Sequence, residues 1–270
     1  MKRFVPFGVL ILGLLVAACM TVKTTQPGAI GVKRKQSFIV SAQEVEQASA
    51  LAYQQAITDG TKRGAVNQDQ RKTERVRAIA NRLIPQTAVF RPDAAKWAWQ
   101  ENVLTDPSVN AYCMAGGKIM VFTGLIDKLN PTDAELAAVI GHEIAHALRE
   151  HSREAMTNAY VQQLALVGLS AATNASADMV QLAGVVSQVT YTLPHSRDME
   201  TEADRIGIEL MARAGYDPHA AVTLFEKMGK ATGNNMPAFL SSHPLSADRA
   251  KNLERAIPRV MPLYEAIAKR

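Results

Sequence analysis

Apolar residues recur every three or four positions along most of the chain and alternate with polar ones only near its middle. The first pattern indicates amphipathic helices and the second a short region of β-strand. We therefore expect a mainly helical α+β fold in a single domain over residues 42–270. The helices are expected at 42–58, 71–83, 132–148, 196–213, 217–230 and 246–257.

The strand region contains a run at 97–104 and a hairpin at 109–124. Gly116-Gly117 separates two apolar, β-rich runs, which is typical of a hairpin turn. Cys113 falls in the first run, where a small buried side chain is a better interpretation than a metal ligand. On pattern alone the hairpin belongs either to the core or to the border of a cleft, where a strand can pair with an extended peptide.

Small apolar residues dominate the stretch 155–189, but polar residues such as Gln162, Asp178 and Gln181 interrupt it. It is therefore not expected to span a membrane. A helical hairpin fits the pattern better, and two roles stay open for it: a lid over a cleft, or plain helical scaffold.

The N-terminus has the pattern of a bacterial lipoprotein signal. Two positive charges precede an apolar run at 5–16, which is too short to span a membrane comfortably, and small residues precede Cys19. This resembles a lipobox, so we expect residues 1–18 to be removed, Cys19 to be acylated and residues 19–41 to form a polar tether. Ordinary secretion with an incidental cysteine is the alternative. The residue after Cys19 is Met20 and not the aspartate that signals retention in the inner membrane. This favours the periplasmic side of the outer membrane.

The overall charge is mild. Removal of the signal would lower the formal charge from +5 to +3, and no basic run with interleaved aromatic residues is present, so nucleic acid is not an expected partner. A single thiol would remain beside the acylated cysteine, which excludes an intramolecular disulfide.

The clearest chemical signal is the segment Gly141-His142-Glu143-Ile144-Ala145-His146. A helix places residues four apart on one face, so the two imidazoles can reach one zinc ion. Glu143 is close enough to take a proton from the attacking water. Thr132, with Glu135 three residues later, predicts a capped helix start just upstream.

A catalytic zinc usually has three protein ligands and one open position. The second predicted helix offers Glu200 and Asp204 on one face, so one can bind the metal while the other accepts a hydrogen bond from a zinc-bound histidine. Glu202 lies elsewhere on this helix and is expected to be a solvated charge. The alternative for Glu200 and Asp204 is an exposed acidic face.

These motifs together resemble the HtpX-type family of zinc metallopeptidases (gluzincins), and within it the BepA- and LoiP-like periplasmic lipoprotein proteases. The resemblance covers about 70–255 and rests on HEIAH, on ETEAD at 200–204, on the hairpin and on the HPLSADR element at 243–249. It implies a zincin-like domain with one zinc ion, Glu200 as third ligand with Asp204 behind it, and a small sheet whose edge hairpin borders the cleft. The substrate-binding positions would be Asn110, Ala111 and Tyr112.

His243 has three possible roles: a transition-state hydrogen-bond donor, an additional zinc ligand that inhibits the enzyme, or a packed structural residue. The resemblance supports the second role. His151, His195 and His219 are expected to be structural or exposed.

The sequence thus predicts a zinc-dependent endopeptidase of the bacterial cell envelope that degrades misfolded or misassembled envelope proteins. A latent zinc-bound chaperone or assembly factor, working with the outer-membrane assembly machinery, is the alternative. A purely structural zinc site is disfavoured because such sites lack a general base like Glu143.

Overall fold

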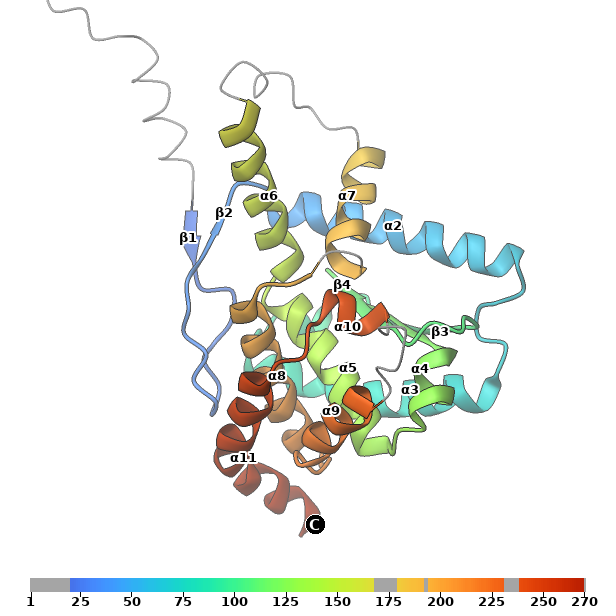
Figure 1. Cartoon of the computed structure of the whole chain (residues 1–270), viewed down its shortest axis with the longest axis vertical. Helices are drawn as coiled ribbons and strands as arrows, with labels where there is room; N and C mark the ends of the chain where they lie inside the picture. Colours follow the sequence, from blue (N-terminus) through green and yellow to red (C-terminus); the bar gives the residue numbers. More distant parts are fainter. Residues whose placement is uncertain (1–19, 168–178, 192–193, 231–237, 270) are drawn as a thin grey trace, which may run out of the picture.

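A buried helix, α5 (Asp133–Leu148), runs through the middle of the computed structural model, which describes residues 20–167, 179–191, 194–230 and 238–269 (Figure 1). The helix begins as predicted: the Thr132 hydroxyl accepts the N–H of Glu135, and the Glu135 carboxylate accepts the N–H of Thr132. Its residues from 135 to 148 are all buried. Solvent therefore reaches neither HExxH histidine freely.

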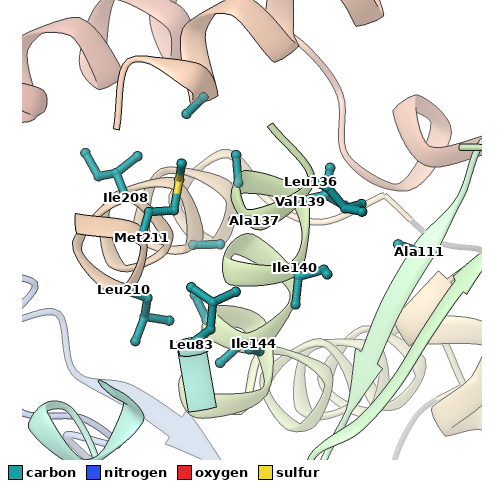
Figure 2. Packing of buried hydrophobic residues seen from close by; sticks show 14 of the residues in the cluster. Leu83, Ala111, Leu136, Ala137, Val139, Ile140, Ile144, Ile208, Leu210 and Met211 are labelled. Atoms are coloured by element: carbon teal, nitrogen blue, oxygen red, sulfur yellow. The ribbon is translucent and has the colours of Figure 1, made fainter. Parts of the chain in front are cut away.

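Helix α8 (Arg197–Arg213) packs along α5, and two glycines set how closely. A Cβ at Gly207 would lie 3.0 Å from the backbone nitrogen of His142, and one at Gly141 would lie 3.1 Å from the carbonyl oxygen of Gly207. A side chain at either position would press against the facing backbone, so the two glycines allow the helices to approach closely. Figure 2 shows the apolar residues that join the two helices, including Ile140 and Ile144 of α5 and Leu210 of α8. This contact brings the carboxylates of α8 to the histidines of α5.

The sheet has three strands, β3 (Gln100–Leu104), β4 (Ala111–Met114) and β5 (Lys118–Phe122), in the order β3-β5-β4. The predicted hairpin is β4–β5, and its turn uses Gly116 and Gly117 at φ 76° and 78°, a conformation that favours glycine. The parallel pairing of β3 with β5 was not predicted.

Strand β4 lies at one edge of the sheet and divides its side chains between two cores. Ala111 and Cys113 pack into the main core with α5, while Tyr112 and Met114 join a second core. This alternation is the period of two expected of a strand. Cys113 is a buried free thiol, as expected.

The second core lies between the sheet and α2 (Ala42–Lys62), α6 (His151–Val167) and α7 (Met179–Tyr191). Helices α6 and α7 confirm the helical character predicted for 155–189, although the residues between them lie outside the described ones. Within the described residues, every helix is too short or too polar to cross a membrane.

The remaining elements surround the α5–α8 pair. They are α3 (Gln70–Leu83), η1 (Ile84–Val89), η2 (Ala94–Lys96), α4 (Thr123–Leu129), α9 (Ala220–Lys230), α10 (Ala238–Ser242) and α11 (Ala247–Ala268). The predicted end of the last helix at 257 is wrong. Helix α11 continues through Pro258 and Pro262, and Val260 in its extension is fully buried against the main core. Packing thus outweighs the cost of proline in a helix.

The prediction of a tether over 19–41 is also wrong for the residues that are described. Strands β1 (Met20–Val22) and β2 (Gln36–Phe38) form an antiparallel pair, and Ile30 and Phe38 are buried. The carboxylate of Glu209 on α8 accepts the N–H of Ile30 at 2.9 Å. We call residues 20–40 the N-terminal strap, because they are folded against the domain.

Candidate active site

Four side-chain donors converge beside α5. They are Nε2 of His142, Nε2 of His146, the carboxylate of Glu200 and Nδ1 of His243. His142 Nε2 lies 3.0 Å from His146 Nε2 and 3.3 Å from His243 Nδ1. Glu200 Oε1 lies 3.4 Å from His146 Nε2 and 2.9 Å from His243 Nδ1.

These separations fit zinc. Ligands about 2.05 Å from a tetrahedral ion lie roughly 3.3 Å from one another; four of the donor pairs lie 2.9 to 3.4 Å apart, and all four donors lie within 4.8 Å of one another. Two or three imidazoles with one carboxylate are also a donor set that zinc prefers. The cluster is therefore a zinc site.

Each donor comes from an element whose position is fixed by local structure. His142 and His146 are one turn apart on α5, and Glu200 lies in the first turn of α8. His243 follows α10, where its N–H donates to the carbonyl of Phe239 at 2.8 Å and the two rings stack. Phe239 in turn donates its N–H to Val109 just before β4, which ties the His243 loop to the sheet edge.

Asp204 lies where the sequence placed it, behind a zinc-ligating histidine. Its Oδ1 is 3.0 Å from Nδ1 of His142. Arg249 donates two hydrogen bonds to the same carboxylate, at 2.8 and 2.7 Å, and its Nη1 lies 2.6 Å from Glu200 Oε2. Burial alone would raise the pKa of Asp204, but the Arg249 guanidinium outweighs it and lowers this pKa. Sequence reasoning gave Arg249 no role, although it ends the HPLSADR element.

Glu143 is buried at the same cluster, with its Oε1 3.5 Å from Nε2 of His243. Neither of these two atoms has a hydrogen-bond partner among the described residues. Burial raises the pKa of the Glu143 carboxyl group. A raised pKa suits a carboxylate that must accept a proton near neutral pH.

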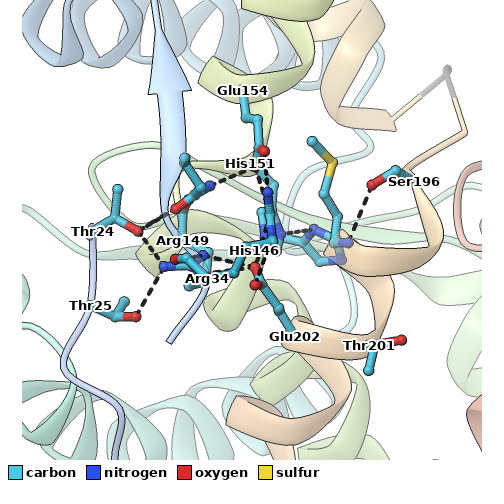
Figure 3. A network of polar contacts seen from close by, with 12 residues as sticks. Thr24, Thr25, Arg34, His146, Arg149, His151, Glu154, Ser196, Thr201 and Glu202 are labelled. Atoms are coloured by element: carbon cyan, nitrogen blue, oxygen red, sulfur yellow. Dashed lines mark hydrogen bonds and ion pairs between the residues drawn. The ribbon is translucent and has the colours of Figure 1, made fainter. Parts of the chain in front are cut away.

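The prediction that Glu202 is a solvated charge is wrong. Glu202 is only 7% exposed, and its Oε2 lies 3.1 Å from Nε2 of His151 and accepts from Nε of Arg149 at 2.9 Å (Figure 3). Burial would raise the pKa of Glu202, but hydrogen bonds from His151 and Arg34 lower it to about 2. The N-terminal strap covers this face of α8, which helix periodicity could not reveal.

Two further histidines adjoin the site. His151 is fully buried, and its Nδ1 lies 2.9 Å from Nδ1 of His146. The buried ring of His195 lies 4.4 Å from that of His146, between centroids, and burial lowers its pKa to about 3. His219 is exposed and pairs with Asp217. His151 and His195 are thus structural rather than ligands, but His151 directly supports a ligand.

The predicted substrate-binding positions have buried side chains. The Asn110 side chain accepts the N–H of Ala111 at 2.9 Å, and the Tyr112 ring packs edge-on against Phe122. What β4 can offer to a peptide is therefore its main chain at the sheet edge.

A helix-borne HExxH, a third ligand from a second helix and a carboxylate behind the first histidine define a zinc metallopeptidase. The chain belongs to peptidase family M48, which it matches over residues 70–257. The family resemblance seen in the motifs is thereby confirmed.

Curated relatives agree with this class. The chain is 43% identical to the mitochondrial metalloendopeptidase OMA1 of Arabidopsis thaliana over 160 residues, which cover 59% of this chain and 32% of that protein. It is 29% identical to the metalloprotease LoiP of Escherichia coli over 232 residues, covering 83% of this chain and 84% of LoiP. With the E. coli metalloprotease YcaL it shares 31% identity over 150 residues, 55% of this chain and 58% of YcaL. The chain spans only a third to a half of the OMA1 proteins of A. thaliana and Saccharomyces cerevisiae.

Proposed function

We propose that the chain is a zinc-dependent endopeptidase of the bacterial cell envelope that degrades misfolded or misassembled envelope proteins. The observation that supports the hydrolytic role is the position of Glu143, a buried carboxylate one residue beyond the zinc ligand His142 and 3.5 Å from Nε2 of His243. A purely structural zinc site has no use for such a base. The names of LoiP and YcaL support proteolysis, and the lipoprotein-like N-terminus supports the envelope.

Zinc, when bound by His142, His146 and Glu200, polarises the scissile carbonyl and makes the attacking water more acidic. Glu143 accepts a proton from that water while the water oxygen bonds to the carbonyl carbon. Glu143 then passes the proton to the amine nitrogen as the C–N bond breaks. Asp204 orients the His142 ring through its Nδ1–H, so the ligands keep their geometry during the reaction.

The edge strand β4 supports the choice of substrate class. A peptide in extended form can add to the sheet at its edge strand β4 through main-chain hydrogen bonds. Such binding gives affinity with little sequence selectivity. Low sequence selectivity suits an enzyme that degrades misfolded chains better than one that cleaves a single sequence.

The position of His243 supports latency at rest. Its Nδ1 would take the fourth donor position that a catalytic zinc leaves open, and its Nε2 faces Glu143 at 3.5 Å. One side chain thus blocks both the water position and the base. Opening the site requires the loop that carries His243 to move, against the hydrogen bonds of Phe239 with Val109 and of His195 with Ser242.

His243→Ala is expected to raise basal cleavage of casein, because the fourth donor position becomes free for water. The matched control is His219→Ala, which removes an exposed histidine outside the site. Zinc content is measured in parallel. A loss of roughly 10²–10³-fold in turnover would instead assign His243 to the oxyanion, and an unchanged rate would leave it only a packing role.

The closed donor set also favours a second candidate function, a latent chaperone or assembly factor whose hydrolysis is secondary. Complementation separates the two. If a Glu143→Gln chain rescues envelope integrity as well as the active chain does, binding is the main function.

Cys19→Ser tests the anchor, although Cys19 lies outside the described residues. The variant is expected to lose lipid attachment, because the thiol is the acyl acceptor, and to leave the outer-membrane fraction. Labelling with a fatty-acid analogue followed by membrane fractionation measures this. Cys113→Ser is the control, since Cys113 is buried and should leave lipidation intact. A processed Cys19→Ser chain that still fractionates with the outer membrane would refute the lipobox.

A further inference from the structure

We propose that His151 and Glu202 position the zinc ligand His146, and that Arg34 of the N-terminal strap is part of this support. The inference rests on the zinc site of the proposed function but not on hydrolysis or on the substrate. It concerns the Nδ1 side of His146, where Figure 3 shows His151 and Glu202.

The two zinc-ligating histidines of α5 are oriented differently. His142 turns its Nδ1 to the carboxylate of Asp204 directly, at 3.0 Å. His146 turns its Nδ1 to another imidazole, Nδ1 of His151, at 2.9 Å. The carboxylate of Glu202 follows one step further on, 3.1 Å from Nε2 of His151.

Hydrogen-bond chemistry fixes the direction of this relay. His146 presents Nε2 to the donor cluster, so the lone pair of Nε2 faces the ion and the proton is on Nδ1. Nδ1 of His151 must therefore accept a hydrogen bond from the Nδ1–H of His146, which leaves the ring proton of His151 on Nε2. From there it donates to Glu202. His151 acts as a neutral spacer that passes the orienting effect of a carboxylate to the zinc ligand.

Glu202 is held in turn by two guanidinium groups. Nε of Arg149, on the turn after α5, donates at 2.9 Å to Oε2, while Nε and Nη2 of Arg34 donate at 2.8 and 3.0 Å to Oε1 and Oε2. Arg34 also pairs with Glu154 on α6, so it joins α6 and α8 across the relay. Its carbonyl accepts a hydrogen bond from Arg149 Nη2 at 3.1 Å.

This arrangement makes the N-terminal strap part of the zinc site's support. Gln36, two residues after Arg34, donates to Glu154 at 2.6 Å, and the Glu209 carboxylate on α8 holds the strap at Ile30. The strap begins directly after Cys19, the expected point of membrane attachment. Zinc retention is therefore expected to depend on a segment far from the HExxH motif in sequence.

Two substitutions of His151 separate positioning from space filling. His151→Asn keeps an acceptor near the position of Nδ1 but loses the donor to Glu202. His151→Gln keeps a donor near Nε2 but loses the acceptor for His146. The two variants are similar in size and polarity, so a merely structural role predicts similar behaviour from both.

The measurement is the zinc dissociation constant of the full mature chain, by competition with a chromophoric chelator, with the visible spectrum of the Co²⁺ form as a second readout. We expect His151→Asn to bind zinc less than about tenfold more weakly, because the acceptor for His146 remains while the hydrogen bond to Glu202 is lost. His151→Gln should bind zinc roughly 10–100-fold more weakly, the usual cost of losing an outer partner of a ligand, with an altered Co²⁺ spectrum. Equal affinities in the two variants, whether both retained or both lost, or the reverse order, would overturn the relay.

The strap is tested with Arg34→Gln, because Arg34 is partly exposed and its replacement need not disrupt folding. We expect Arg34→Gln to bind zinc more weakly than wild type, by less than roughly tenfold. Arg259→Gln is the matched control, since Arg259 donates to the strap at the Ala29 carbonyl, away from Glu202. Arg34→Gln with unchanged affinity, or Arg259→Gln with the same loss, would remove Arg34 from the relay. Neither readout uses peptidase activity, so failure here leaves the proposed function untouched.

Discussion

Glu143→Gln is expected to keep its zinc and to lose casein cleavage by roughly 10²–10⁴-fold, the usual contribution of a general base. The amide has the shape of the carboxylate but cannot accept a proton from water. The four zinc donors are untouched, because Glu143 is not among them. The effect should therefore appear in turnover and not in metal content.

A low wild-type rate would make the effect of Glu143→Gln hard to measure. If His243 blocks the site at rest, the wild-type rate is itself low, and the loss is measured best in a His243→Ala background. Comparing His243→Ala with the Glu143→Gln/His243→Ala chain gives the contribution of Glu143 alone. Retained cleavage in the double variant, with zinc bound, would remove Glu143 from the role of base.

Glu200→Gln is expected to weaken zinc binding and abolish peptidase activity. An amide oxygen carries no charge and is a poor zinc ligand compared with a carboxylate. Arg249 remains paired with Asp204 in this variant, so a buried guanidinium is not left without a partner.

The structure also sets the size of this effect. Three imidazoles remain around the site in Glu200→Gln, because His243 supplies the third. Zinc binding should therefore be weaker in this variant. It should be lost in Glu200→Gln/His243→Ala, where only two of the imidazole ligands remain. Metal analysis by mass spectrometry and chelator competition measures both. Asp198→Ala is the control, an exposed acidic residue in the same first helical turn, and an unchanged zinc affinity in Glu200→Gln would contradict the ligand assignment.

The local sequence predicted the elements that carry the chemistry. The capping box at Thr132 and Glu135 starts α5, a four-residue spacing aligns His142 with His146, and two glycines make the β4–β5 turn. All of these depend on contacts between residues close in the chain, which propensity and periodicity describe well. Glu200, Asp204 and His243 were identified by motif, and the structure brings all three to the two histidines.

Only the tertiary structure decided what covers each helix. Glu202 leaves α8 roughly 200° around the axis from Glu200, and nothing in the helix itself shows that this face meets His151 and Arg34. The strap looked like a tether because its few apolar residues have no periodicity, yet Ile30 and Phe38 are buried by helices distant in sequence. Periodicity shows that a face is apolar or polar. Which segment packs on that face depends on contacts between parts of the chain far apart in sequence, and only the folded molecule contains them.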